Sequence, residues 1–123
     1  MKSAILDTSF ILSCVRNKID FAEKIAHEGF EIIIPEQVLK ELRSISSSQK
    51  KQQFRNEANL SLEILKKVPF KKIELEANYV DEGIKIFAIK NPDAVVATLD
   101  REIKKAVRNR KLIIRGKKKI EFL

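Results

Sequence analysis

The feature that most constrains the fold is an apolar run that leads through a threonine to a carboxylate. Residues 94–97 are small or β-branched apolar residues, and Thr98 and Asp100 follow them. From Ile103 onward, the apolar residues recur at helical spacing. The stretch therefore predicts a buried strand, a tight turn and a helix, with Asp100 at the point where the helix begins.

The start of the chain repeats this construction. Residues 3–6 form an apolar run that ends at Asp7, and a helical pattern follows. In an open parallel sheet, ligands bind beyond the carboxyl ends of the strands, so two strands would each deliver an Asp to one edge. Converging carboxylates repel each other, and a hard cation such as Mg²⁺ or Mn²⁺ can hold them together. Each Asp by itself is equally well explained as a helix N-cap, and both interpretations stay open here.

Strand and helix patterns alternate along the rest of the chain. We expect strands at residues 30–34, 70–75 and 111–115, and a short edge strand at 120–123. We expect helices at residues 8–16 and 49–67. Two further helices should follow N-caps at Asp20 and Asn78, another should have Pro35 as its first residue, and the last should begin after Asp100. This order predicts an α/β fold of three layers, α/β/α, around a central parallel sheet of four to five strands. A length of 123 residues suits one domain, 1–123.

Four acidic residues fall at or near the edge where these strands end. They are Asp7, Glu41, Asp81 and Asp100. A single glutamate on an amphipathic helix, such as Glu41, is usually a solvent-exposed residue without a specific role, but four acids at one edge predict a common site. The hydroxyl groups of Thr8, Ser9 and Thr98 lie close to these acids in sequence, where they can orient a carboxylate or a water, or cap a helix.

The positive charge is concentrated in the last quarter of the chain. The net charge is +8, yet residues 101–119 alone carry ten Lys or Arg against one acid, Glu102, so the remainder nets −1. Such a patch predicts a polyanion partner, with RNA the first candidate, although a merely solvated Lys-rich surface is the alternative. The residues that we expect to contact RNA are Arg101, Lys104, Arg108, Arg115, Lys117, Lys118 and Lys119. The Ser-rich residues 44–48 are either part of a mobile arm over that RNA or a plain turn between helices.

Several classes of protein are disfavoured. A single cysteine, Cys14, cannot form an internal disulfide and is expected in the core, and a single histidine, His27, argues against a zinc site. No apolar run approaches the length of a membrane span, and none of the signal-peptide type follows the first residue, so we expect a cytoplasmic protein without a membrane partner.

Four short motifs in a fixed order carry a family resemblance. They read Ile5-Leu6-Asp7-Thr8-Ser9, Pro35-Glu36-Gln37-Val38-Leu39-Lys40-Glu41-Leu42, Tyr79-Val80-Asp81-Glu82 and Val96-Ala97-Thr98-Leu99-Asp100. In this order the chain resembles the PIN-domain nucleases, and its carboxyl-terminal part is similar to the archaeal branch of ribosomal-RNA-processing members and to toxin nucleases of the VapC type. Many members have Asn at the position of Ser9 and a second Asp at the position of Glu82.

The resemblance implies an RNA-cleaving site. It carries over Asp7, Glu41, Asp81 and Asp100 as catalytic, metal-binding residues for Mg²⁺ or Mn²⁺, in a metal-dependent endoribonuclease of the ribosomal-RNA-maturation type. The alternatives are a toxin ribonuclease with a small antitoxin protein as partner, and an inactive domain that binds RNA; a homodimer is a further candidate assembly. Receiver domains need an acidic neighbour beside Asp7, and haloacid-dehalogenase phosphatases need Asp at Ser9, so both are disfavoured.

Overall fold

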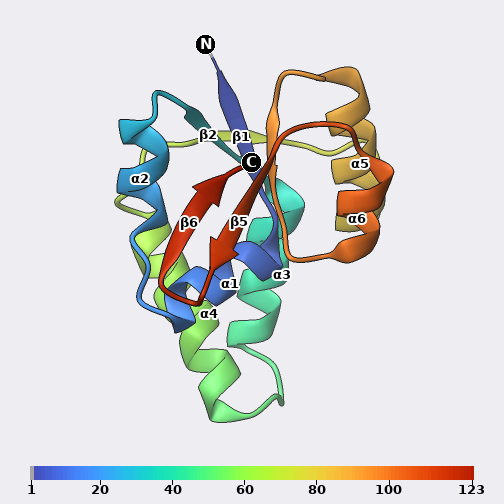
Figure 1. Ribbon diagram of the computed structural model, residues 1–123. Helices are drawn as coiled ribbons and strands as arrows, with labels where there is room; N and C mark the ends of the chain where they lie inside the picture. The colour runs from blue at the N-terminus through green and yellow to red at the C-terminus, as the bar shows by residue number, and fades with distance from the viewer. Residues whose placement is uncertain (1) are drawn as a thin grey trace.

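The computed structural model describes residues 2–123, which form one mixed sheet between two layers of helices (Figure 1). The six strands are β1 (Ser3–Leu6), β2 (Glu31–Pro35), β3 (Lys71–Ile73), β4 (Val95–Ala97), β5 (Lys111–Arg115) and β6 (Lys119–Phe122). The helices are α1 (Thr8–Arg16), α2 (Phe21–His27), α3 (Glu36–Ser46), α4 (Gln52–Leu65), α5 (Val80–Lys90) and α6 (Arg101–Ala106). Helices α1 to α4 cover one face, and α5 and α6 cover the other (Figure 1).

The sheet has the order β3-β2-β1-β4-β5-β6. All neighbouring strands are parallel except β5 and β6, which are antiparallel. The predicted three-layer α/β/α architecture is confirmed: five strands are parallel, in line with the expected four to five, and β6 is the short edge strand expected near the end of the sequence. The additional pairing is possible because Gly116 and Lys117 adopt φ values of 59° and 56°, which turn the chain back on itself after β5.

The two strands with which the sequence pattern began, β1 and β4, are neighbours at the centre of the sheet. Ala4 pairs with Val95 and Leu6 with Ala97, so both strands end at the same level. Their apolar side chains are almost fully buried, as expected for a parallel sheet covered on both faces. Cys14 is buried as expected, and burial raises the pKa of its thiol to about 12.

Several predicted helix boundaries were wrong by a few residues. Pro35 is not the first helical residue: its extended ψ of 144° makes it the last residue of β2 and the N-cap of α3. The N-cap of α5 is Tyr79 rather than Asn78. Helix α3 extends through Ser46, and the helix expected at 49–67 is confined to α4, so the Ser-rich segment forms the end of α3 and a turn between two packed helices. Among residues 2–123, none of the helices combines the length and the hydropathy that crossing a bilayer requires.

A buried asparagine links three segments at the edge of the sheet opposite the carboxyl ends of the parallel strands. The side-chain amide of Asn109 donates to the backbone oxygens of Ala88, Asn91 and Ala94, at 3.1, 2.9 and 2.9 Å. These contacts tie the end of α5 and the start of β4 to the connection between α6 and β5. Sequence pattern gave no indication of this role, because the partners are 15 to 21 residues away.

We predict that Asn109→Ala destabilises the fold by about 2 kcal/mol, because buried carbonyl groups left without a donor cost ~1–3 kcal/mol. Urea unfolding followed by circular dichroism measures the change. Asn59→Ala, on the exposed face of α4, is the matched control and should stay within about 0.5 kcal/mol of wild type. Equal stability of the two variants would contradict the role assigned to Asn109.

Candidate active site

The site is built where β1 and β4 end. The backbone N–H of Asp7 donates to the carbonyl of Ala97 at 2.9 Å, so the two strands stay paired one residue beyond β1. The next residue after β4, Thr98, is fully buried, and its hydroxyl donates to Oδ2 of Asp7 at 2.7 Å. The same oxygen of Thr98 accepts from the backbone N–H of Asp100 at 3.0 Å. One hydroxyl therefore connects the two aspartates that the sequence placed at this edge.

Both aspartates are helix caps as well as members of the site. Oδ1 of Asp7 accepts from the N–H of Thr8 at 2.8 Å, and Oδ1 of Asp100 accepts from the N–H of Glu102 and of Ile103. Asp7 is further held by the Ser9 hydroxyl, 3.2 Å from Oδ2. The carboxyl group of Asp81 lies close enough to that of Asp100 to share a hydrogen bond with it, so these two acids are direct neighbours. The capping interpretation of Asp7 and Asp100 is therefore confirmed, and the role of these two aspartates in a cation site stays a prediction.

The third acid comes from the neighbouring helix. Glu41 lies on α3, and its Oε1 accepts a hydrogen bond from the hydroxyl of Thr8. Its side chain therefore turns from α3 toward the ends of the strands, as the sequence predicted, and it is not merely a solvent-exposed residue. Thr8, Ser9 and Thr98 all contact the acids, so each hydroxyl singled out in the sequence lies at the site.

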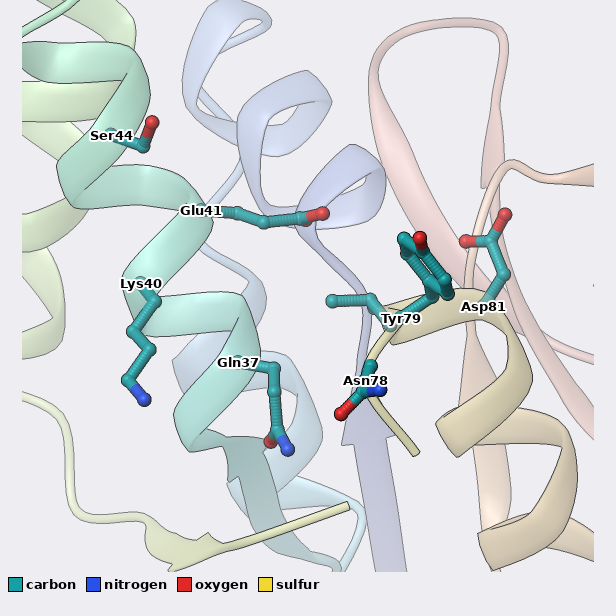
Figure 2. A pocket seen from close by; sticks show the side chains of 8 residues that line it. Gln37, Lys40, Glu41, Ser44, Asn78, Tyr79 and Asp81 are labelled. Atoms are coloured by element: carbon teal, nitrogen blue, oxygen red, sulfur yellow. The ribbon is translucent and has the colours of Figure 1, made fainter. Parts of the chain in front are cut away.

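Asp81 approaches from the other helical layer, in the first turn of α5. Figure 2 shows Glu41 and Asp81 on opposite sides of one cavity, with a volume of about 390 Å³, between α3 and the start of α5. Asp7 and Asp100 do not line this cavity, but their charges act on the side chains that do. The structure thus brings all four predicted acids to one region.

Two residues that the sequence did not single out position α5. The side-chain amide of Gln37 bonds both backbone groups of Leu75, at 3.2 Å to its oxygen and 3.1 Å to its N–H. Leu75 packs so closely on Gly83 of α5 that a Cβ added there would lie 2.5 Å from the Leu75 Cβ. A glycine inside a helix was the available signal, because this position normally favours alanine. Nothing in the sequence marked Gln37.

The acids form one electrostatic cluster. Burial raises the pKa of Asp7, and hydrogen bonds from Thr98, Thr8 and Ser9 oppose part of that rise. Burial likewise raises the pKa of Glu41, and the charges of Asp7 and Asp81 add to it. The pKa of Asp81 is raised by burial and then by the charges of Asp100 and Asp7. Adding a cation would relieve this repulsion.

The donor chemistry fits a hard divalent cation, because all four acids present carboxylate oxygens. The side chains do not form a closed cage: across residues 2–123, no three His, Cys, Asp or Glu are already arranged around one metal position. Asp7 is held firmly by hydroxyl and backbone donors, whereas Glu41 and Asp81 are both exposed. The predicted metal-binding role of these residues stays a prediction.

Comparison with known proteins identifies the family. The chain matches the profile of the PIN like domain over residues 4–117. It belongs to the PIN-domain family of nucleases. It is 31% identical over 129 residues to Ribonuclease VapC4 of Methanocaldococcus jannaschii, covering 99% of this chain and 97% of that protein. The solved structure of the PIN domain endonuclease Utp24 shares the fold, with a TM-score of 0.76, 24% identity, and coverage of 98% of this chain and 92% of that one.

Most of the basic residues expected to contact RNA lie at the same edge of this PIN domain as the acids. Arg101 and Lys104 are in α6, whose N-cap is Asp100. Lys117 and Lys118 lie in the turn after β5, and Lys119 begins β6. Because β5 runs parallel to β4, this turn is at the acidic edge.

Two of the expected RNA contacts are differently placed. Arg115 is paired with Glu121 at 2.7 Å, so its guanidinium already has an acidic partner. Arg108 lies between α6 and β5, at the opposite edge of the sheet. Lys18 and Lys24, which the sequence did not suggest, join Lys118 and Lys119 around a second cavity of about 310 Å³. Their positions around the α1–α2 connection could not be read from the local sequence.

We predict that the stability of Asp7→Asn relative to wild type increases as the pH rises. Because the pKa of Asp7 is raised in the folded chain, its protonated form favours folding below the ordinary pKa of 3.8, and this contribution is lost as the pH rises through the raised pKa. The Asn variant does not lose stability in this way, because its side chain does not ionise. Its changed hydrogen bonds alter the free energy of unfolding by an amount that is the same at every pH. Urea unfolding from about pH 4 to pH 7, without divalent ions, measures the trend.

Asp93→Asn, in the exposed turn before β4, controls for the removal of one negative charge. A stability difference between Asp7→Asn and wild type that is the same at every pH would contradict the prediction.

Proposed function

We propose that the chain is a metal-dependent endoribonuclease that hydrolyses RNA phosphodiester bonds. The supporting observation is the Thr98 hydroxyl, which links Asp7 and Asp100 where two adjacent parallel strands end. Glu41 and Asp81 complete an acidic cluster, in which the negative charge of one carboxylate makes the ionisation of its neighbours less favourable. A phosphate would be repelled by such a cluster, so its use as a nuclease site requires Mg²⁺ or Mn²⁺.

The four carboxylates would hold one or two such ions. A bound ion supplies positive charge at the phosphate and lowers the pKa of the attacking water. Asp7 gives a fixed reference position, because three donors hold its two oxygens. Thr98 orients that carboxylate, and Thr8 orients Glu41. This chemistry needs no histidine or lysine base, which suits a site built from acids and hydroxyls.

The basic residues would hold the RNA backbone. Phosphate contacts from Lys and Arg fix the position of a strand without reading its bases. Arg101, Lys104 and residues 117–119 are exposed or half-exposed at the acidic edge, so they can contact phosphates on either side of the cut. Arg108, at the opposite edge, is a weaker candidate than the sequence implied.

Two biological roles follow from the same chemistry. Ribosomal RNA maturation in the cytoplasm is the role that the sequence resemblance favoured. The 31% identity to Ribonuclease VapC4 supports the alternative of a toxin ribonuclease, in which a small antitoxin would cover the site. An RNA-binding domain without activity is the least supported alternative, because all four acids are present. A small reading frame next to the gene would favour the toxin role.

We predict that the protein cleaves RNA with Mg²⁺ or Mn²⁺ and is inactive in EDTA. Asp7→Asn and Asp100→Asn should each lower kcat by at least about 100-fold, because even outer partners of a metal ligand cost ~10–100-fold when lost. Cleavage of end-labelled single-stranded and hairpin RNAs by highly purified protein measures this.

Asp93→Asn is the matched control for these substitutions and should retain wild-type cleavage. If wild type and Asp7→Asn share the same residual activity on every RNA, the observed cleavage is a contaminant and the proposal fails.

We predict that reversing the charges of Lys117, Lys118 and Lys119 to Glu weakens RNA binding and flattens its dependence on salt. Each lost phosphate contact reduces the slope of log K against log salt by about 0.7 for a single strand, so three contacts give a change of about 2. Fluorescence anisotropy across a salt series measures both effects.

The matched control is the triple reversal at Lys66, Lys67 and Lys71, which lie where α4 leads into β3 at the opposite edge. Its salt slope should stay close to that of wild type. Equal effects of the two triple reversals would show that net charge, and not the turn after β5, governs binding.

A further inference from the structure

An exposed aromatic ring stands beside the acids. Tyr79 is the only tyrosine of the chain, and its side chain is 76% exposed, more than any other large hydrophobic residue in the described part. It is the N-cap of α5, two residues before Asp81, and it lines the same cavity as Glu41 and Asp81. Figure 2 shows its ring between the side chains of these two acids.

The fold does not require this ring. Within residues 2–123, the hydroxyl of Tyr79 has no hydrogen-bond partner and its ring pairs with no other aromatic, whereas Phe10, Phe21 and Phe30 are buried in the core. As N-cap, Tyr79 provides no side-chain hydrogen bond to α5. Threonine, serine or aspartate would serve the helix better at this position. A ring kept in water at the mouth of an acidic cavity therefore indicates a ligand with a flat face.

We propose that Tyr79 stacks on an unpaired base of the RNA next to the bond that is cut, and so positions the strand against the acids. This rests on the proposed ribonuclease function and adds a residue that positions its substrate. Aromatic side chains bind bases by stacking without regard to sequence, since every base has a π face. In a duplex both faces of an internal base are covered by its neighbours, so only an unpaired base can reach the ring.

The opposite wall of the cavity supports this orientation of the strand. Lys40 lies on α3 across from Tyr79, is exposed, and forms no ion pair with any of residues 2–123 (Figure 2). Its ammonium group can hold a phosphate on the strand whose base lies against the ring. The cavity, about 390 Å³, falls within the range of ~300–1,000 Å³ that is usual for small ligands. A single splayed nucleotide is a ligand of this size.

The test compares Tyr79→Ala with Tyr79→Phe, which keeps the ring and loses the hydroxyl. Binding of a fluorescent 12-nucleotide single strand, and of a set of strands that each lack one base, is measured with Ca²⁺ in place of Mg²⁺. Carboxylate oxygens also bind Ca²⁺, so the repulsion between the acids and the phosphates is relieved, and a gel checks that each strand stays intact. We expect Tyr79→Ala to bind about tenfold more weakly, and Tyr79→Phe to bind within about twofold of wild type. Ile89→Ala, an exposed residue on the same helix about 15 Å further along, is the control and should bind normally.

The decisive observation is coupling to one base. Removing the stacked base should weaken binding by wild type about as much as Tyr79→Ala does, and should have no further effect on that variant. A 2-aminopurine at that position should lose fluorescence on binding wild type or Tyr79→Phe, but not Tyr79→Ala. The thermal unfolding of all variants is followed to show that they are folded.

The proposal is overturned if no missing base is coupled to Tyr79, if Tyr79→Phe loses as much affinity as Tyr79→Ala, or if duplex RNA binds with the same dependence on the ring. It is also overturned if only a Lys- and Arg-rich peptide, and no RNA, depends on Tyr79. Cleavage with Mg²⁺ is scored separately. If one base is coupled to Tyr79 but the protein does not cleave RNA, the proposed function fails and the stacking role stands. If the protein cleaves RNA but no base is coupled to Tyr79, the proposed function stands and the stacking role fails.

Discussion

The hydrogen bond from Thr98 to Asp7 is the interaction on which the rest of the site depends. It places a donor against a carboxylate that burial would otherwise penalise, and it joins the ends of the two central strands. The hydroxyl oxygen also accepts a hydrogen bond from the backbone N–H of Asp100, so one oxygen sets the position of both aspartates. A valine would fill the same volume but could make neither bond. The apolar run before Thr98 therefore matters because it brings this hydroxyl to the correct level beside β1.

The order of the strands places the basic last quarter of the sequence on one side of the molecule. Every strand after β4 lies on the far side of β1 from β2, so the basic last quarter of the chain forms its own flank of the molecule. Because β5 runs parallel to β4, the turn at residues 116–118 emerges at the acidic edge. Arg108 has the same composition around it but belongs to the preceding connection, and so it lies at the other edge. Composition predicts the partner, and strand direction decides which residues can meet it.

The sequence was informative where structure follows from local pattern. Apolar runs ending in Asp7 and Asp100 located β1, β4 and the helices after them, and the motifs around Glu41 and Asp81 located the other acids. It was uninformative where one side chain bonds a distant backbone. Gln37 holds Leu75 from 38 residues away, and Asn109 reaches back to Ala88, so neither leaves a periodic signal. Tyr79 was visible within a motif, but its exposure depends on where α5 begins, which the sequence misjudged by one residue.

Capping explains how the fold tolerates a cluster of acids at one edge of the sheet. Oδ1 of Asp100 is used by the start of α6, and both oxygens of Asp7 are used by Thr8, Ser9 and Thr98. The helix starts thus stabilise the two charges that the strands bring together, since an N-terminus favours an anion. Glu41 and Asp81 have fewer such donors, and each feels the charges of its neighbours in a raised pKa. In the proposed nuclease, the first two acids would set the position of the ion, and the last two would respond to its arrival.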